Sequence, residues 1–189
     1  MSEKSELIKK LLDVEWKMFK AVRAEEPVSC QQDPEGFRLH RGAQFSVWSE
    51  ATLQSYLDDL VKAEEKGENL LTLKYARMEN IVPILNFNLL ICQILDLQVE
   101  AQREMQEKYP AIASRGRKLE DSSEGATSFR SYLQSELETY SDRTLDLLYK
   151  DIQETNERGE NWSILTHSNL FKQMGFTSID EVEKRLSAQ

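Results

Sequence analysis

Apolar residues recur every three or four positions in four long segments of the chain. The segments cover 6–22, 50–66, 88–106 and 142–158, and each would bury one face of a helix. No segment is predicted to be a strand, because none shows a sustained alternation of apolar and polar residues. The pattern therefore predicts an all-α protein.

Capping residues indicate several shorter helices. Asp33 followed by Pro34 is typical of a helix start, and Ser178 with Glu181 has the spacing of a capping box. Ser128 would begin a counterpart of the helix that starts at Asp33. The other short helices are expected at about 34–47, 70–78, 162–174 and 178–187.

The chain also resembles itself. When residues 37–73 are placed against 129–165, at an offset of 92, eleven of the 37 positions are identical, whereas chance would give about two. Further upstream, 12–14 resembles 95–97 at an offset of 83. The match indicates an internal duplication.

This duplication predicts the domain organisation. We expect a single helical domain over 1–189, a bundle in which two sequence-related repeats, about 5–79 and 86–175, share one core. An approximate two-fold axis would relate the repeats, and a C-terminal helix at about 178–187 would follow them.

Two nearly identical stretches, EKGEN and ERGEN, lie 92 residues apart within the matched region. Gly67 and Gly159 would each end a helix in the left-handed conformation, and Asn69 and Asn161 would cap the helix that follows. A binding signature that is used twice is the alternative interpretation. We favour the structural one, since every shared residue has a capping or packing role.

Composition limits the classes of partner. The chain has 40% hydrophobic and 30% charged residues and a net charge of −9, so its field should repel nucleic acid and anionic membranes. Its longest apolar run is far shorter than the roughly 20 residues of a spanning helix, and the start of the sequence shows no signal-peptide pattern. We expect a cytoplasmic protein with no nucleic-acid or membrane partner, and its oligomeric state stays open.

Several short motifs occur along the chain in this order: EWKMF (15–19), SCQ (29–31), QFSVWSE (44–50), KYARM (74–78), SRGR (114–117) and ELETYS (136–141). Together they resemble a bacterial family catalogued as domain of unknown function 4125. The resemblance implies a bacterial helical domain that stands alone. The resemblance assigns no catalytic residue to this chain.

Polar side chains interrupt two apolar helix faces. Glu15 lies on the inward face of the first helix, and Arg41 and Gln44 lie on the inward face of the next. The position matching Gln44 in the second repeat is Glu136, so we expect Glu15, Arg41 and Glu136 to converge between the repeats. Two acids around one arginine would leave excess negative charge, which a proton, a cation or a further arginine could balance. A buried ion pair that holds the helices in register is the structural alternative.

Arg115 and Arg117 form a basic cluster in the polar segment 113–127, which should be a surface loop. They could grip a carboxylate or phosphate and lie over the opening of the site, with Tyr75 or Tyr132 nearby. Solvated loop charges, or side chains capping a helix end, are the alternative interpretation.

Cofactor and metal motifs are weak. His40 and His167 have no metal-ligand spacing, and no glycine-rich phosphate loop is present. Cys30 and Cys92 lie in different settings, so free thiols are expected, and Cys30 near a helix start is a candidate reactive thiol. We expect no cofactor and no metal.

Three functions remain open. The first is a non-catalytic module that binds a small anionic ligand or a protein partner in a groove between the repeats. The second is an enzyme that uses Glu15 or Glu136 as general acid or base, with an arginine orienting an anionic substrate. The third is a structural scaffold whose polar interior only sets helix register.

Overall fold

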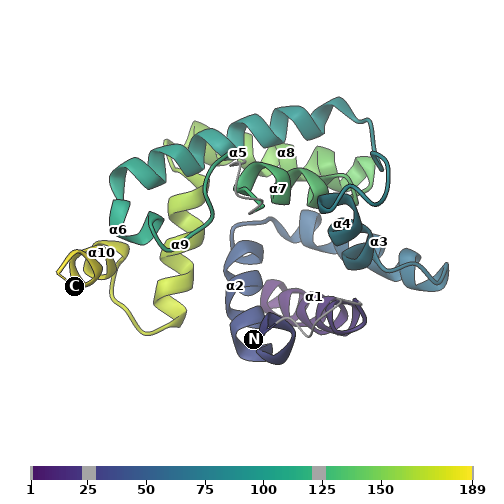
Figure 1. Cartoon of the computed structure of the whole chain (residues 1–189), viewed down its shortest axis with the longest axis horizontal. Coiled ribbons are helices and arrows are strands. Elements are labelled where there is room, and N and C mark those ends of the chain that lie inside the picture. The colour runs from purple at the N-terminus through teal and green to yellow at the C-terminus, as the bar shows by residue number, and fades with distance from the viewer. Residues whose placement is uncertain (1, 23–28, 121–126, 189) are drawn as a thin grey trace.

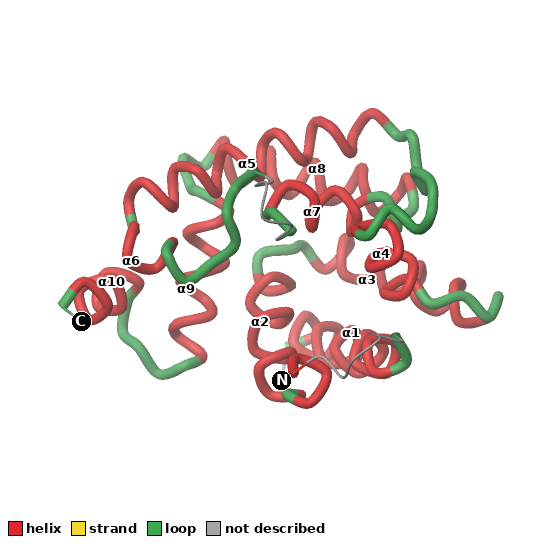
Figure 2. The backbone as a smooth tube through the Cα atoms, in the orientation of Figure 1, coloured by secondary structure: helices red, strands yellow, loops and turns green. Residues whose placement is uncertain are grey.

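The structure is a computed structural model that describes residues 2–22, 29–120 and 127–188. Within these ranges all regular structure is helical, and no strand occurs (Figures 1 and 2). The predicted all-α class is therefore confirmed. None of the helices in this part of the chain has the length and apolar character needed to cross a membrane.

The helices follow the predicted order. In sequence they are α1 (Glu3–Lys20), the 3-10 turn η1 (Ser29–Gln32), α2 (Pro34–Ser46), α3 (Glu50–Glu65), α4 (Leu70–Met78), α5 (Leu89–Lys108), α6 (Pro110–Ala113), α7 (Phe129–Leu137), α8 (Asp142–Glu157), α9 (Trp162–Gln173) and α10 (Ile179–Ser187).

The N-terminal and C-terminal helices pack across one another. α2 packs on α9 and α4 packs on α7, while α3 and α8 meet. In Figure 1, α5 runs along the upper edge, whereas α1 and α2 lie at the lower edge. One large core cluster draws buried residues from both groups of helices, and a smaller cluster lies under α10.

The repeated stretches are helix ends and starts, as predicted. Gly67 and Gly159 have φ of 72° and 70°, and a Cβ on either would meet nothing within 4 Å. The side chains of Asn69 and Asn161 accept from the backbone N–H groups of the first turns of α4 and α9. Left-handed backbone geometry, rather than lack of space, is thus what favours glycine at both positions.

Further shared residues form a reciprocal contact between α3 and α8. Asp151 Oδ2 accepts from Ser49 N (2.8 Å) and from Thr52 Oγ1 (2.6 Å) at the start of α3. The equivalent set, offset by 92 residues, makes the same two bonds in the opposite direction: Asp59 Oδ2 accepts from Ser141 N (3.1 Å) and from Thr144 Oγ1 (2.6 Å). Each helix therefore caps the start of the other.

Three segments add detail to the structure expected from the sequence. The polar segment at 113–127 begins at the end of the short helix α6 and continues through turns to residue 120, while 121–126 lie outside the described residues. Cys92 is a free, exposed thiol, as expected, but the side chain of Cys30 lies outside the described part. The α4–α5 connection leaves Ile81 and Phe87 largely exposed.

Candidate functional site

Four charged side chains meet in the interior, each from a different helix. Glu15 comes from α1, Arg41 from α2, Lys74 from α4 and Glu136 from α7. All four are buried, and Glu15 is only 1% exposed. We call these four residues the ion network.

Glu15 and Arg41 form its first pair. Arg41 Nε donates to Glu15 Oε2 at 2.8 Å, and Arg41 Nη2 donates to Glu15 Oε1 at 2.5 Å, which is a two-pronged contact. Tyr56 Oη, from α3, also donates to Glu15 Oε1 at 2.8 Å. Both oxygens of the buried carboxylate are therefore satisfied.

Glu136 joins this pair to a second cation. Its Oε1 lies 2.8 Å from Arg41 Nη2 and accepts from Tyr140 Oη at 2.8 Å, and its Oε2 accepts from Lys74 Nζ at 2.9 Å. The structure thus brings Glu15, Arg41 and Glu136 together as expected. The excess negative charge expected for two acids around one arginine is balanced by a cation of the chain itself, because Lys74 supplies the second positive charge.

Sequence reasoning missed Lys74, although a signal was present. Lys74 follows Leu70 and Leu71 at helical spacing, and all three are the buried residues of α4. Because lysine is usually exposed, the sequence pattern did not indicate that Lys74 points inward. Lys74 is in fact only 6% exposed.

The surroundings fix the protonation states of the network. Burial alone would raise the pKa of Glu136, but Arg41 and Lys74 outweigh it and hold the pKa at about 2. Burial alone would lower the pKa of Lys74 and of Arg41, yet the neighbouring carboxylates raise both above their usual values. Near neutral pH these three groups are therefore held in their charged forms.

The two tyrosine candidates and Arg117 lie near the Lys74 end of the network. Lys74 Nζ is 3.7 Å from the centre of the Tyr132 ring and 5.8 Å from that of Tyr75. The guanidinium carbon of Arg117 is 4.7 Å from the centre of the Tyr132 ring, and Arg117 Nη1 donates to Thr127 O at 3.1 Å. Arg117 thus contacts the network through Tyr132. Neither Arg115 nor Arg117 is among the residues that line the pocket described next.

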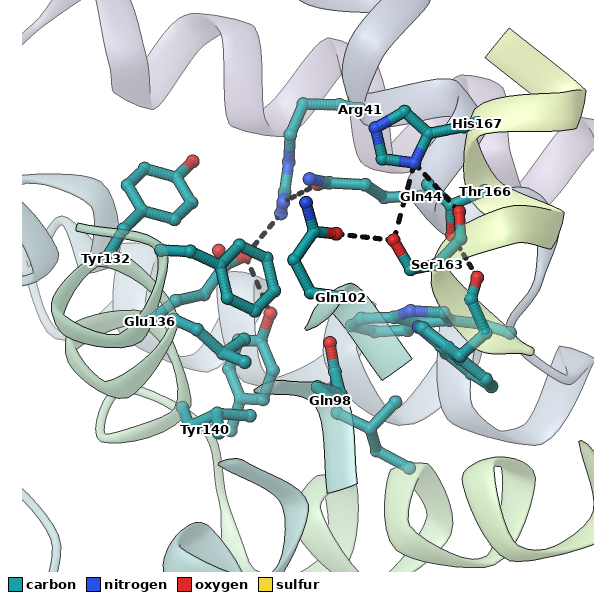
Figure 3. Close-up of a pocket in the computed structure, with 16 residues that line it drawn as sticks. Arg41, Gln44, Gln98, Gln102, Tyr132, Glu136, Tyr140, Ser163, Thr166 and His167 are labelled. Atoms are coloured by element: carbon teal, nitrogen blue, oxygen red, sulfur yellow. Dashed lines mark hydrogen bonds and ion pairs between the residues drawn. The ribbon is translucent and has the colours of Figure 1, made fainter. Parts of the chain in front are cut away.

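A pocket of about 120 Å³ lies beside the network, between α2, α5, α7 and α9 (Figure 3). Arg41 and Glu136 belong both to the ion network and to the lining of this pocket. The other polar side chains around the pocket are Gln44, Gln98, Gln102, Tyr132, Tyr140, Ser163, Thr166 and His167. Its apolar lining is Trp48, Phe129, Leu133, Leu137, Leu148 and Trp162.

Hydrogen bonds order the polar groups of the pocket. Arg41 Nη1 donates to Gln44 Oε1, and Ser163 Oγ donates to Gln102 Oε1. His167 Nδ1 lies 2.8 Å from the carbonyl oxygen of Ser163. Because a carbonyl only accepts, Nδ1 must carry a proton.

His167 is neutral in this setting. Its burial lowers the pKa of the imidazole, while the bond to Ser163 O acts in the opposite direction and His40 lowers it further. With the proton on Nδ1, the Nε2 atom is an acceptor. The sequence offered only a faint signal for this residue, since Ser163 and His167 are four residues apart on one helix face.

No group of three or more His, Cys, Asp or Glu side chains that could hold a metal ion occurs among the residues that the structure describes. The polar groups around the pocket are mainly amides, hydroxyls and one imidazole. They suit hydrogen bonding to an organic molecule better than coordination of a hard cation.

Comparison with known proteins identifies the family. A family model described as "Protein of unknown function (DUF4125)" matches residues 5–184. No curated protein and no solved structure matches the chain. The resemblance seen in the short sequence motifs is confirmed.

Proposed function

The chain belongs to this DUF4125 family, and we propose that it is a binding module that holds a small molecule in the pocket between α2, α5, α7 and α9. One observation carries the proposal: Gln102 is only 8% exposed, yet its amide nitrogen has no hydrogen-bond partner among the described residues. A buried donor without an acceptor costs about 1–3 kcal/mol. A bound molecule would supply that acceptor.

We also propose that the chain consists of two repeats, about 5–79 and 86–175, with the pocket between them. The reciprocal bonds of Asp59 and Asp151 support this arrangement, because a two-fold relation would produce such a pair. Superposing 37–73 on 129–165 in an experimental structure should align three successive helices. Failure of that alignment would overturn the repeat.

The charge of the network revises the expected ligand. Glu15 and Glu136 offset Arg41 and Lys74, so no positive charge of the network is left over for an anion. The amide nitrogens of Gln44 and Gln102 are uncharged donors that have no acceptor among the described residues. A neutral polar ligand therefore fits the pocket better than the small anion expected from the sequence.

The enzyme alternative has less support. A general acid or base needs a pKa near the working pH, whereas the pKa of Glu136 is held at about 2. Both oxygens of Glu15 already accept hydrogen bonds from Arg41 or Tyr56. Either carboxylate would have to break several buried bonds before it could move a substrate proton.

The scaffold alternative accounts for the network but not for the pocket. A pocket of about 120 Å³, lined by polar and apolar side chains, remains beside the network. A purely structural interior gains by filling such a space. The pocket is thus better explained by binding.

A protein partner is the second candidate, and one observation favours it. Ile81, Phe87 and Leu89 are 69%, 80% and 78% exposed, and residues 80–95 carry no charge. Apolar side chains gathered on a surface are typical of association sites. A second copy of this chain is the proposed occupant, because the uncharged segment lets two acidic molecules approach. Sedimentation velocity should show association that Phe87→Ser weakens; a monomer at every concentration would contradict it.

A cytoplasmic location in a bacterium is part of the proposal. It rests on the composition and on the motif resemblance given above. Fractionation of cells that produce the protein should place it with the soluble contents, and recovery with membranes would contradict it.

Saturation-transfer NMR with benzamide, benzoate and toluene tests the binding function. At least one of the three should bind the natural protein, and Leu133→Trp, which fills the pocket, should abolish that binding. Leu57→Trp is the matched control, because Leu57 is also half-buried but lies outside the pocket. Absence of binding by all three compounds, or equal binding by Leu133→Trp, would contradict the proposal.

A further inference from the structure

The orientation of Gln44 is fixed by Arg41. A guanidinium group only donates hydrogen bonds, so the atom of Gln44 that faces Arg41 Nη1 must be its amide oxygen. The amide nitrogen of Gln44 is then left to donate elsewhere. No described residue accepts from it.

Gln102 presents a second donor. Its amide oxygen accepts from Ser163 Oγ, and Figure 3 shows the opposite end of the amide pointing toward Arg41 and Gln44. Gln44 and Gln102 both line the pocket. One ligand oxygen with two lone pairs could accept from both.

His167 adds an acceptor. Its protonated Nδ1 is held by the carbonyl of Ser163, which leaves Nε2 with a lone pair and no partner among the described residues. A ligand that meets this atom needs an N–H or O–H group. A carboxylate has neither, and its oxygen would face the lone pair of Nε2 unfavourably.

The size of the pocket limits the rest of the molecule. A cavity of roughly 150 Å³ lined by apolar side chains is known to hold benzene, and this pocket has about 120 Å³ and is continuous with solvent. Trp48, Leu133 and Trp162 supply apolar lining. The space therefore suits one ring, with part of the ligand reaching the opening.

We infer that the ligand is a single-ring compound with a neutral carboxamide, whose oxygen accepts from Gln44 and Gln102 and whose N–H donates to His167. This inference rests on the proposed binding function. The ring lies against the apolar lining. Recognition of the carboxamide depends on Arg41, because Arg41 holds the oxygen of Gln44 and so aims its nitrogen.

Isothermal titration with benzamide, benzoate and toluene tests the ligand class. Benzamide should bind at least about 10-fold more tightly than either of the others, a difference of roughly 1.4 kcal/mol. Tighter binding of benzoate or toluene would overturn the inference and leave the binding function standing. Binding of none of the three would overturn both.

Two variants and one control identify the recognising groups. Gln102→Leu should weaken benzamide binding at least about 10-fold, whereas Gln93→Leu, an exposed glutamine on the same helix, should leave it unchanged. His167→Phe should remove the preference for benzamide over benzoate even if total affinity changes little. Thermal melting of each variant confirms that it is folded, and a preference that persists in folded His167→Phe would overturn the role of Nε2.

Discussion

Matching interior positions in the two halves of the molecule hold different chemistry. In the first half they are Glu15, Arg41, Tyr56 and Lys74, which are charged or hydroxyl-bearing and bonded to one another or to Glu136. At the same positions by sequence offset, the second half has Gln98, Leu133, Leu148 and Thr166. All four of these line the pocket.

The space left in each half follows from this difference. Around Glu15, Tyr56 and Lys74 the remaining void is about 20 Å³, whereas the second half keeps about 120 Å³. Long charged side chains that pair with each other fill the first interior, and neutral or shorter ones leave the second open. The first-half positions thus hold the helices in register, whereas the second-half positions, together with α2, line the pocket that has room for a ligand.

The largest expected effect is that of removing Arg41. Arg41→Met leaves Glu15 without its cation, and breaking a buried pair in this way costs about 3–5 kcal/mol of unfolding free energy. Leu133→Met, at the matching position of the other half, should cost less than about 1.5 kcal/mol. Urea unfolding measures both. Similar losses of unfolding free energy for the two variants would contradict the difference between the matching interior positions.

Acid should weaken the ion network through Glu136. The folded pKa of Glu136 is about 2, below its ordinary value of 4.5, so its contribution is full above about pH 4.5 and is lost as the pH falls toward 2. The shift corresponds to about 3 kcal/mol. The difference in unfolding free energy between the natural protein and Glu136→Gln should therefore shrink between pH 4.5 and pH 2. A difference that stays constant with pH would contradict this account of Glu136.

The two reciprocal caps, made by Asp59 and Asp151, should contribute equally to stability, in contrast to the interior positions of the two halves. Asp59→Ala and Asp151→Ala each remove two bonds to a helix start and should each cost about 2 kcal/mol. Asp146→Ala, which removes an exposed ion pair, is the control and should change stability by less than about 1 kcal/mol. Markedly unequal losses for Asp59 and Asp151 would show that the two ends are not equivalent.

The smallest expected effect concerns the shared glycines. Gly67→Ala and Gly159→Ala should each cost about 1 kcal/mol, because alanine is strained at positive φ. Benzamide affinity should be unchanged in both. A folded Gly67→Ala protein that no longer binds benzamide would restore the interpretation of EKGEN as a ligand signature.

The sequence predicted the helices well because their ends depend on local chemistry. Ser49 and Asn69 cap helices with their own side chains, and Gly67 adopts a backbone conformation that few other residues tolerate. These effects act within a few residues. They can therefore be recognised without knowing which helices meet.

The site was predicted only in part. Glu15 stood out because a carboxylate on an apolar helix face needs a partner. Lys74 did not, because a lysine near apolar residues usually extends its charge to solvent. The roles of Gln102 and His167 depend on how α9 packs against α2 and α5, and helical spacing carries no information about that packing.

Isothermal titration of benzamide into Lys74→Met and Gln102→Leu tests most directly whether the ion network and the pocket have separate roles. Lys74→Met should unfold at lower urea concentration but bind benzamide with an affinity within about 3-fold of that of the natural protein. Gln102→Leu should stay as stable as the natural protein and lose at least about 10-fold in affinity. Loss of binding in a folded Lys74→Met protein, together with unchanged binding by Gln102→Leu, would contradict the division between a structural network and a binding pocket.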